Sequence, residues 1–340
     1  MLERPRRPVS PTTFRRIAAA SLVLLVLIVV TGAAVRLTGS GLGCTDWPRC
    51  TDRQFVAPDD LHARIEFGNR LLTGVVSVSV ALAVTGSLRR APRRRDLVLL
   101  SAGLVAGVIG QIVLGGLVVL SHLNPWLVQG HFVLSMLLVL DAAVLAHRAA
   151  IPDDATMRPV VTPTVERVGR ALAGFGAVVL LTGTLVTGSG PHSGSKEVEE
   201  GASRADALDA VREIRRLPLA VHDAARIHGV AVWLFLAGAT WLLVRLRRDG
   251  APEALARAAT WLVTAIVLQG ALGYTQYATG VPPLLVGLHV LGASLVWVAV
   301  LRVALAMRAP AVVAGTDRGP DSGGGFRPHR DADRDLLAAG

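Results

Sequence analysis

The chain has 340 residues, and 52% of them are hydrophobic, with a mean hydropathy of +0.51, yet it carries 35 lysines and arginines and a formal net charge of +10. These values coexist only if the charges lie between long apolar segments. The basic clusters do alternate with such segments, a pattern that argues against a nucleic-acid-binding surface.

Apolar segments of about twenty residues are long enough to cross the core of a bilayer. Eight are present, and they predict an all-α polytopic membrane protein. They cover residues 17–37, 65–88, 97–120, 127–147, 168–187, 224–244, 256–277 and 284–307. Arginine clusters lie before the first span and after the second, fourth, sixth and eighth. Basic loops stay inside the cell, so the sequence predicts a multi-pass protein of the cell membrane with both termini in the cytoplasm.

The spans repeat along the chain. Gln111 and His131 are twenty residues apart, as are Gln269 and His289, and a Thr-Gly-Ser-Gly sequence closes both the first and the fifth span. Four spans per repeat give both repeats the same orientation. We therefore expect two tandem, pseudo-symmetric four-helix halves. The predicted units are a disordered cytoplasmic arm (1–16), an N-terminal half (17–148), a cytoplasmic linker (149–167), a C-terminal half (168–308) and a disordered tail (309–340).

The repeat leaves one alignment open, in the second span. When the residue spacing between the two halves is subtracted from the position of His228 in the sixth span, the equivalent position in the second span is at or beside Asn69. Matching Ala63-Arg-Ile-Glu66 to Ala225-Arg-Ile-His228 would instead pair Glu66 with His228. The sequence alone permits both alignments.

The two predicted long outer loops differ in content. Residues 38–61 hold the only cysteines, Cys44 and Cys50, which in an oxidising compartment predict a small disulfide loop. Free thiols or a metal pair are the alternatives, although no further metal ligand is close in sequence. The other loop, 188–223, contains an amphipathic segment, 203–217, which predicts a short helix on the membrane surface or over a pocket.

Polar residues gather where the first two spans meet the outer side. Arg36 ends the first span, where it would either reach the headgroups or bind an anionic group of a ligand. His62, Glu66 and Asn69 follow at i, i+4 and i+7, so they share one helix face, which must look into protein or water. Glu66 is either the acid of a reaction centre or the partner of Arg70 or a protonated His62.

Three histidines lie at one depth in the outer leaflet. His131, His228 and His289 each lie one to two turns inside a helix that starts on the outer side. A single histidine of this kind is often a packing residue, but three at one level indicate a shared cofactor. Facing imidazoles are the usual axial pair of a heme, whereas zinc or copper would need a tighter ligand cluster. Neighbouring glycines at Gly229, Gly287 and Gly292 would let a flat macrocycle approach the backbone.

The sequence resembles the heme A synthase family. The resemblance covers all eight spans and rests on Arg36-Leu-Thr-Gly-Ser-Gly-Leu-Gly-Cys44-x-Asp-Trp-Pro-x-Cys50, on Glu66-x-x-Asn69-Arg70 and on the three histidines. It implies an enzyme that oxidises the C8 methyl group of heme O to the formyl group of heme A, for use by terminal oxidases. A heme O synthase and an electron donor would be its partners.

The resemblance also implies two heme sites. The C-terminal half would hold a heme b through His228 and His289, and the N-terminal half would bind the substrate heme through His131, with Glu66 as the essential carboxylate. Arg36, Asn69 and Arg70 are further candidate contacts of the substrate heme.

Two features depart from the family pattern. The family commonly has histidine three residues after the glutamate, where this chain has Asn69. The substrate iron is then held by His131 alone, or also by His62, although seven helical residues separate His62 from that position by about 10 Å. A second cysteine pair found in some relatives is absent. A diheme electron carrier and a small-molecule transporter are the alternative functions.

Overall fold

The computed structural model describes residues 8–192 and 216–311. Within these ranges, eight helices are long and apolar enough to cross a membrane, which confirms the predicted all-α polytopic membrane protein. They are α1 (Pro11–Leu37), α2 (Leu61–Arg89), α3 (Arg95–Leu120), α4 (Pro125–Ala149), α5 (Pro163–Ser189), α7 (Val221–Arg248), α8 (Glu253–Ala278) and α9 (Pro283–Ala306). The predicted helix at 203–217 lies outside the described residues, except for its last two.

The first helix begins earlier than the apolar span suggested. Ser10 caps α1 by accepting a hydrogen bond from the Thr13 N–H at 3.2 Å, and Pro11 occupies the first turn, where no backbone donor is needed. Residues 11–16 are therefore helical, and the prediction that they are disordered is wrong. The cap is a local side-chain effect that a hydropathy window does not register.

A small sheet joins the predicted linker to the start of the predicted tail. Strand β1 (Thr156–Pro159) pairs antiparallel with β2 (Arg308–Ala311). Residues 309–311 are thus ordered in a strand, contrary to the expectation for the tail. The pairing fixes the end of α9 beside the segment that leads into α5.

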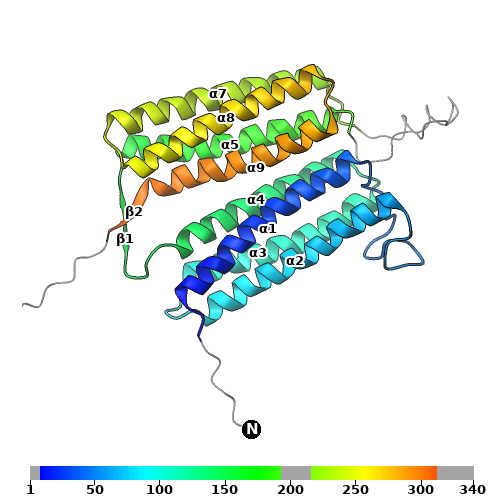
Figure 1. Cartoon of the computed structure of the whole chain (residues 1–340), viewed down its shortest axis with the longest axis horizontal. Coiled ribbons are helices and arrows are strands. Elements are labelled where there is room, and N and C mark those ends of the chain that lie inside the picture. The colour runs from blue at the N-terminus through cyan, green and yellow to red at the C-terminus, as the bar shows by residue number, and fades with distance from the viewer. Residues whose placement is uncertain (1–7, 193–215, 312–340) are drawn as a thin grey trace, which may run out of the picture.

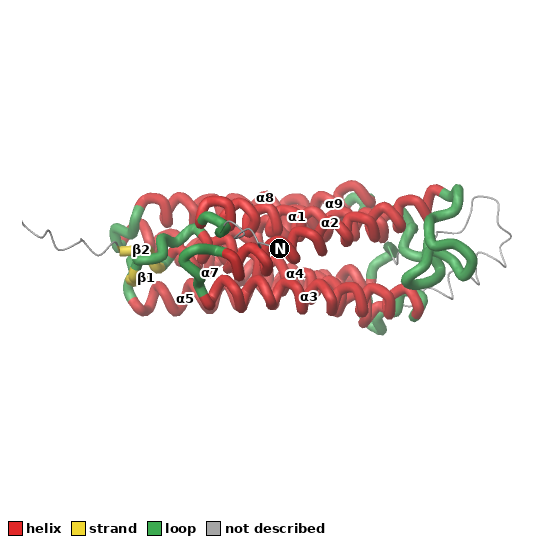
Figure 2. The backbone as a smooth tube through the Cα atoms, turned by 90° about the horizontal axis from the view of Figure 1, so that it is seen from below, coloured by secondary structure: helices red, strands yellow, loops and turns green. Residues whose placement is uncertain are grey.

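The eight helices form two four-helix bundles that lie side by side (Figure 1). One bundle contains α1 to α4, and the other contains α5, α7, α8 and α9. Helices α1 and α4 contact α9, and α4 also contacts α5, so these four make the seam between the halves. All helices run along one long direction, with the loops at its two ends (Figure 2).

Helix α2 has one apolar face suited to contact with lipid and one face packed in the bundle. Leu71, Val75, Val78 and Leu82 form a stripe at helical spacing, and each is more than half exposed. Val76, Val80 and Ala83 on the other side of the helix are buried in the bundle. The exposed stripe is suited to hydrocarbon, while Glu66 and Ser79 are buried in the protein.

Candidate functional site

Each pair of consecutive helices places one polar side chain against a glycine of its partner helix. His289 of α9 lies on Gly273 of α8, where a Cβ atom would be 3.1 Å from the ring carbon Cε1. His131 of α4 lies in the same way on Gly115 of α3, with a corresponding distance of 3.3 Å. Any residue larger than glycine would push on these rings. The glycines thus form seats that fix where each imidazole lies.

The third histidine has both a seat and a hydrogen-bond partner. A Cβ at Gly183 of α5 would lie 3.2 Å from Cε1 of His228, and the Thr182 hydroxyl oxygen lies 3.1 Å from His228 Nδ1. Because the Thr182 hydroxyl donates its proton to the Val179 carbonyl at 2.9 Å, it accepts from the Nδ1–H of the ring. The Nε2 lone pair of His228 therefore remains available to a metal.

Two glutamines hold the other histidine-bearing helices. Gln111 Nε2 donates to the main-chain oxygen of His131 at 3.0 Å, and Gln269 Nε2 donates to that of His289 at 2.6 Å. The Nδ1 atoms of both rings are buried and have no hydrogen-bond partner among the described residues. The glutamines thus hold the backbone at each histidine, and both rings keep nitrogens available to a non-protein group.

The donor set fits a porphyrin better than a bare metal ion. Among residues 8–192 and 216–311, no three histidine, cysteine, aspartate or glutamate side chains converge on one point. His228 of α7 and His289 of α9 lie within electrostatic range of each other in the C-terminal half. Heme iron brings four nitrogens of its own and needs only two axial ligands, so this pair is sufficient for it.

Asn69 occupies the fourth seat. Its Oδ1 accepts a hydrogen bond from Thr31 Oγ1 at 2.8 Å, and a Cβ at Gly32 would lie 4.0 Å from its Nδ2. Thr31 and Gly32 of α1 therefore hold Asn69 of α2 as Thr182 and Gly183 hold the sixth-span histidine. Of the two alignments that the sequence permitted, these contacts favour Asn69, not Glu66, as the counterpart of His228.

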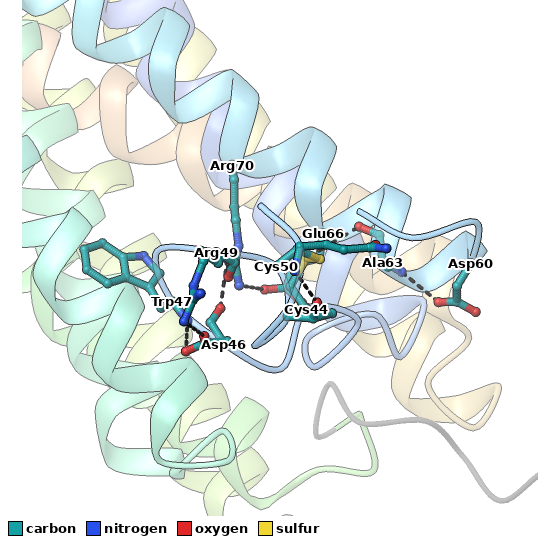
Figure 3. The surroundings of a disulfide bond; sticks show 11 residues. Cys44, Asp46, Trp47, Arg49, Cys50, Asp60, Ala63, Glu66 and Arg70 are labelled. Carbon is teal, nitrogen blue, oxygen red and sulfur yellow. Dashed lines mark hydrogen bonds and ion pairs between the residues drawn. A yellow bond between two sulfur atoms is a disulfide. The ribbon is translucent and has the colours of Figure 1, made fainter. Parts of the chain in front are cut away.

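Glu66 faces the outer loop and is tied to it. Glu66 is 6% exposed, and its carboxylate Oε2 accepts from the Cys44 N–H at 2.7 Å, while Oε1 accepts from Arg70 Nη2 at 2.6 Å (Figure 3). Arg70 also donates to the carbonyl oxygens of Asp46 and Arg49, both at 3.0 Å. The ion pair with Arg70 that the sequence left as an alternative is thus present. His62 is not its partner, because His62 Nδ1 lies 3.0 Å from the Ser40 hydroxyl.

The loop between α1 and α2 covers the outer end of the N-terminal half. Cys44 and Cys50 form the predicted disulfide, and both are completely buried. Between them, Trp47 packs its ring on Gly116 of α3, with a Cβ there only 2.9 Å from Trp47 Cδ2. Gly116 follows Gly115, the seat of the fourth-span histidine, so Trp47 contacts α3 one residue from that seat.

Arg36 links the two halves. Its Nη2 donates to the main-chain oxygen of Thr187, in the last turn of α5, at 2.6 Å, while its Nε is buried and has no partner among the described residues. Arg36 thus satisfies a carbonyl at the end of a helix in the other half. The contact with headgroups or with a ligand anion that the sequence suggested stays a prediction.

The glycines that touch the histidine rings are not the three that the sequence predicted to lie beside the macrocycle, and the role of those three stays a prediction. Gly292 lies against the Gln269 side chain and Gly287 against Leu37, while a Cβ at Gly229 would meet nothing within 4 Å. The true seats could have been found from the repeat, since Gly115 and Gly273 precede their histidines by the same sixteen residues. Which helix packs against each ring is information that only the fold contains.

Together these features define a class of protein: a multi-pass membrane protein with three histidines, each near the start of its helix and against a glycine of a neighbouring helix. The chain belongs to the cytochrome oxidase assembly protein family, whose model matches residues 15–301. It is similar to the heme A synthase of Azorhizobium caulinodans, at 28% identity over 318 residues that cover 82% of this chain and 89% of that one.

Two further heme A synthases align over shorter stretches. The protein of Lysinibacillus sphaericus is 35% identical over 129 residues, and that of Geobacillus kaustophilus is 33% identical over 107 residues. These alignments cover 38% and 31% of this chain, but only 41% and 33% of the two relatives.

Proposed function

We propose that the protein is a heme A synthase, which oxidises the C8 methyl group of heme O to a formyl group. Support comes from the family match across both halves and from the Azorhizobium relative, which aligns over 82% of this chain. The structural observation that carries the proposal is the set of four seats, of which three hold a histidine and one holds Asn69. The two halves share an architecture but differ in the number of iron ligands they offer.

The difference between the halves suggests that one holds the cofactor and the other the substrate. His228 and His289 would grip a heme b from both sides in the C-terminal half, so this heme would be retained as the cofactor. His131 alone would hold heme O in the N-terminal half, where the product must leave after each reaction. When bound, the hemes supply electron transfer and the oxidising chemistry, while the chain supplies position and a site closed by the 38–60 loop.

Glu66 is the carboxylate that we propose to accept protons at the N-terminal site. It lies one helical turn outward from Asn69 and is nearly fully buried. Its contact with Arg70 at 2.6 Å stabilises the ionised carboxylate, which is the form that accepts a proton. In the resting arrangement its oxygens are occupied by Arg70 and by the Cys44 N–H, so proton transfer requires one of these bonds to open.

A heme extraction experiment tests the proposed function. The full chain is produced in a host that supplies heme O, and the extracted hemes are separated by chromatography and identified by mass. A formyl or hydroxymethyl heme is the expected product. Heme b alone would instead support a diheme electron carrier, and the absence of any heme would support a transporter. The His131→Ala variant, which removes the expected substrate ligand, is the matched control and should form no heme A.

We also propose that both termini lie in the cytoplasm. Arg89 ends α2 and Arg90 follows it, and Arg245, Arg247 and Arg248 end α7, on the side of the bundle where α1 begins. A fluorescent reporter fused to the C-terminus should be active only in the cytoplasm, and periplasmic or extracellular activity would reject this orientation. A heme O synthase and an electron donor remain the partners that the pathway requires.

A further inference from the structure

Asn69 stands where the internal repeat has a histidine, and its surroundings are almost the same. Thr31 Oγ1 lies 2.8 Å from Asn69 Oδ1 and 3.2 Å from the Ile28 carbonyl. In the other half, Thr182 also contacts His228 and the carbonyl three residues before itself, but there the hydroxyl accepts from the ring, whereas Thr31 donates to Asn69. The asparagine therefore has a threonine and a glycine as neighbours, as the histidine does, although its glycine contact is looser, and it presents an amide in place of an imidazole.

The hydrogen bond from Thr31 decides which end of the amide is free. Because Oδ1 accepts from the threonine, the Nδ2 group, on the Gly32 side, keeps its N–H donors, and no described residue accepts from them. A side-chain amide nitrogen has no lone pair suited to iron, but it donates hydrogen bonds well. This position can therefore not serve as an axial ligand and can serve as a donor.

The other polar side chains on this face of α2 are already engaged. His62 is bonded to Ser40, and Glu66 is bonded to Cys44 and to Arg70. Both oxygens of Glu66 are thus committed to protein contacts, whereas His62 Nε2 and Asn69 Nδ2 have no hydrogen-bond partner among the described residues, and of these two it is Asn69 that is the counterpart of His228.

We propose that Asn69 is a positioning residue on the open axial side of the substrate heme, where its Nδ2–H donates a hydrogen bond to a small diatomic ligand on the iron. Thr31 orients the amide for this role. The proposal rests on the proposed function, because it assumes that His131 holds the substrate heme on the opposite side. Hydrogen-bond donors beside an open iron position decide whether a diatomic ligand binds and how it is polarised.

The test uses carbon monoxide as the probe on the purified full-length protein, reduced after production in a host that supplies heme O. One heme per chain should bind CO in the wild type, and Asn69→His should lose this binding because histidine closes the open position. The mirror variant His228→Asn should make the heme of the C-terminal half bind CO while His289 still holds it. In Asn69→Leu, CO should still bind, with a higher C–O stretching frequency because the hydrogen bond is lost. Thr31→Val should shift that frequency in the same direction.

The outcomes separate this inference from the function on which it rests. If His131→Ala removes a heme, but the wild type binds no CO or Asn69→Leu leaves the C–O frequency unchanged, the role of Asn69 is overturned and the synthase proposal stands. If His131→Ala removes no heme and no heme A forms in the wild type, the proposed function itself fails. The mirror variant His228→Asn alters the other half, so it still tests whether asparagine at such a position leaves a heme open to CO, even if substitutions at Asn69 impair folding.

Discussion

The Nη2 atom of Arg36 lies 2.6 Å from the main-chain oxygen of Thr187, so the outer end of α1 is tied to the outer end of α5 across the seam between the halves. Arg36→Met should destabilise the protein by about 1.5–3 kcal/mol, the usual contribution of a hydrogen bond from a charged group. Thermal unfolding in detergent measures this loss. Arg15→Met removes the same charge from the exposed other end of α1 and should leave the melting temperature unchanged. Equal melting of both variants would show that the link between the halves contributes nothing.

The glycine seats predict a difference between two glycines of one helix. Gly273→Ala places a methyl group 3.1 Å from the His289 ring, and overpacking of this kind costs about 1–3 kcal/mol. We expect a lower heme b content and a shifted midpoint potential in this variant, both of which are measured by redox titration of the absorption spectrum. Gly270→Ala, which would meet nothing within 4 Å, is the control and should retain the wild-type spectrum. A normal spectrum in Gly273→Ala would argue against His289 as a ligand.

Glu66→Gln should leave the heme b spectrum intact and abolish heme A formation, because a neutral amide cannot accept the proton. The chain offers a close control in Glu166, which is also buried and pairs with an arginine at i+4, Arg170, at 2.7 Å near the start of α5. Glu166→Gln should therefore still form heme A. Heme extraction measures both results, and normal heme A in Glu66→Gln would refute the catalytic role.

A separate measurement distinguishes proton transfer from loop anchoring at Glu66. Limited proteolysis of the 45–60 segment reports whether the loop stays closed in Glu66→Gln. A protected loop in a variant that forms no heme A would favour the proton-transfer role, whereas a cleaved loop would mean that anchoring is the main contribution.

Removal of the disulfide should loosen the cover of the N-terminal half. In the chain-entropy account, a cross-link that closes a loop this short contributes about 2 kcal/mol. The double variant Cys44→Ser, Cys50→Ser should therefore unfold at a lower temperature and be cleaved faster in the outer loop, with Trp47 leaving Gly116. Reduction of the wild-type protein should reproduce both changes. Unchanged proteolysis would show that the contacts of Glu66 and Arg70 hold the loop without the disulfide.

Much of the architecture could be predicted because membrane spans depend on composition over long windows. The eight apolar segments, the arginine clusters between them and the twenty-residue spacing of Gln111 and His131 are all local or periodic properties of the chain. The disulfide was predictable as well, since only two cysteines exist. The early start of α1 was missed because one serine side chain sets it.

The sequence by itself determined the fold class, the depth of the histidines and the set of residues that could form a site. Only the tertiary structure decided which of them meet: that Asn69 is the counterpart of His228, that Gly115, Gly183 and Gly273 carry the rings, and that Arg36 bonds to Thr187. The physical reason is that burial of apolar surface depends on composition, which can be read along the chain. Hydrogen bonds and close packing depend instead on distances of a few ångströms between residues far apart in sequence, and these are set when the helices pack together.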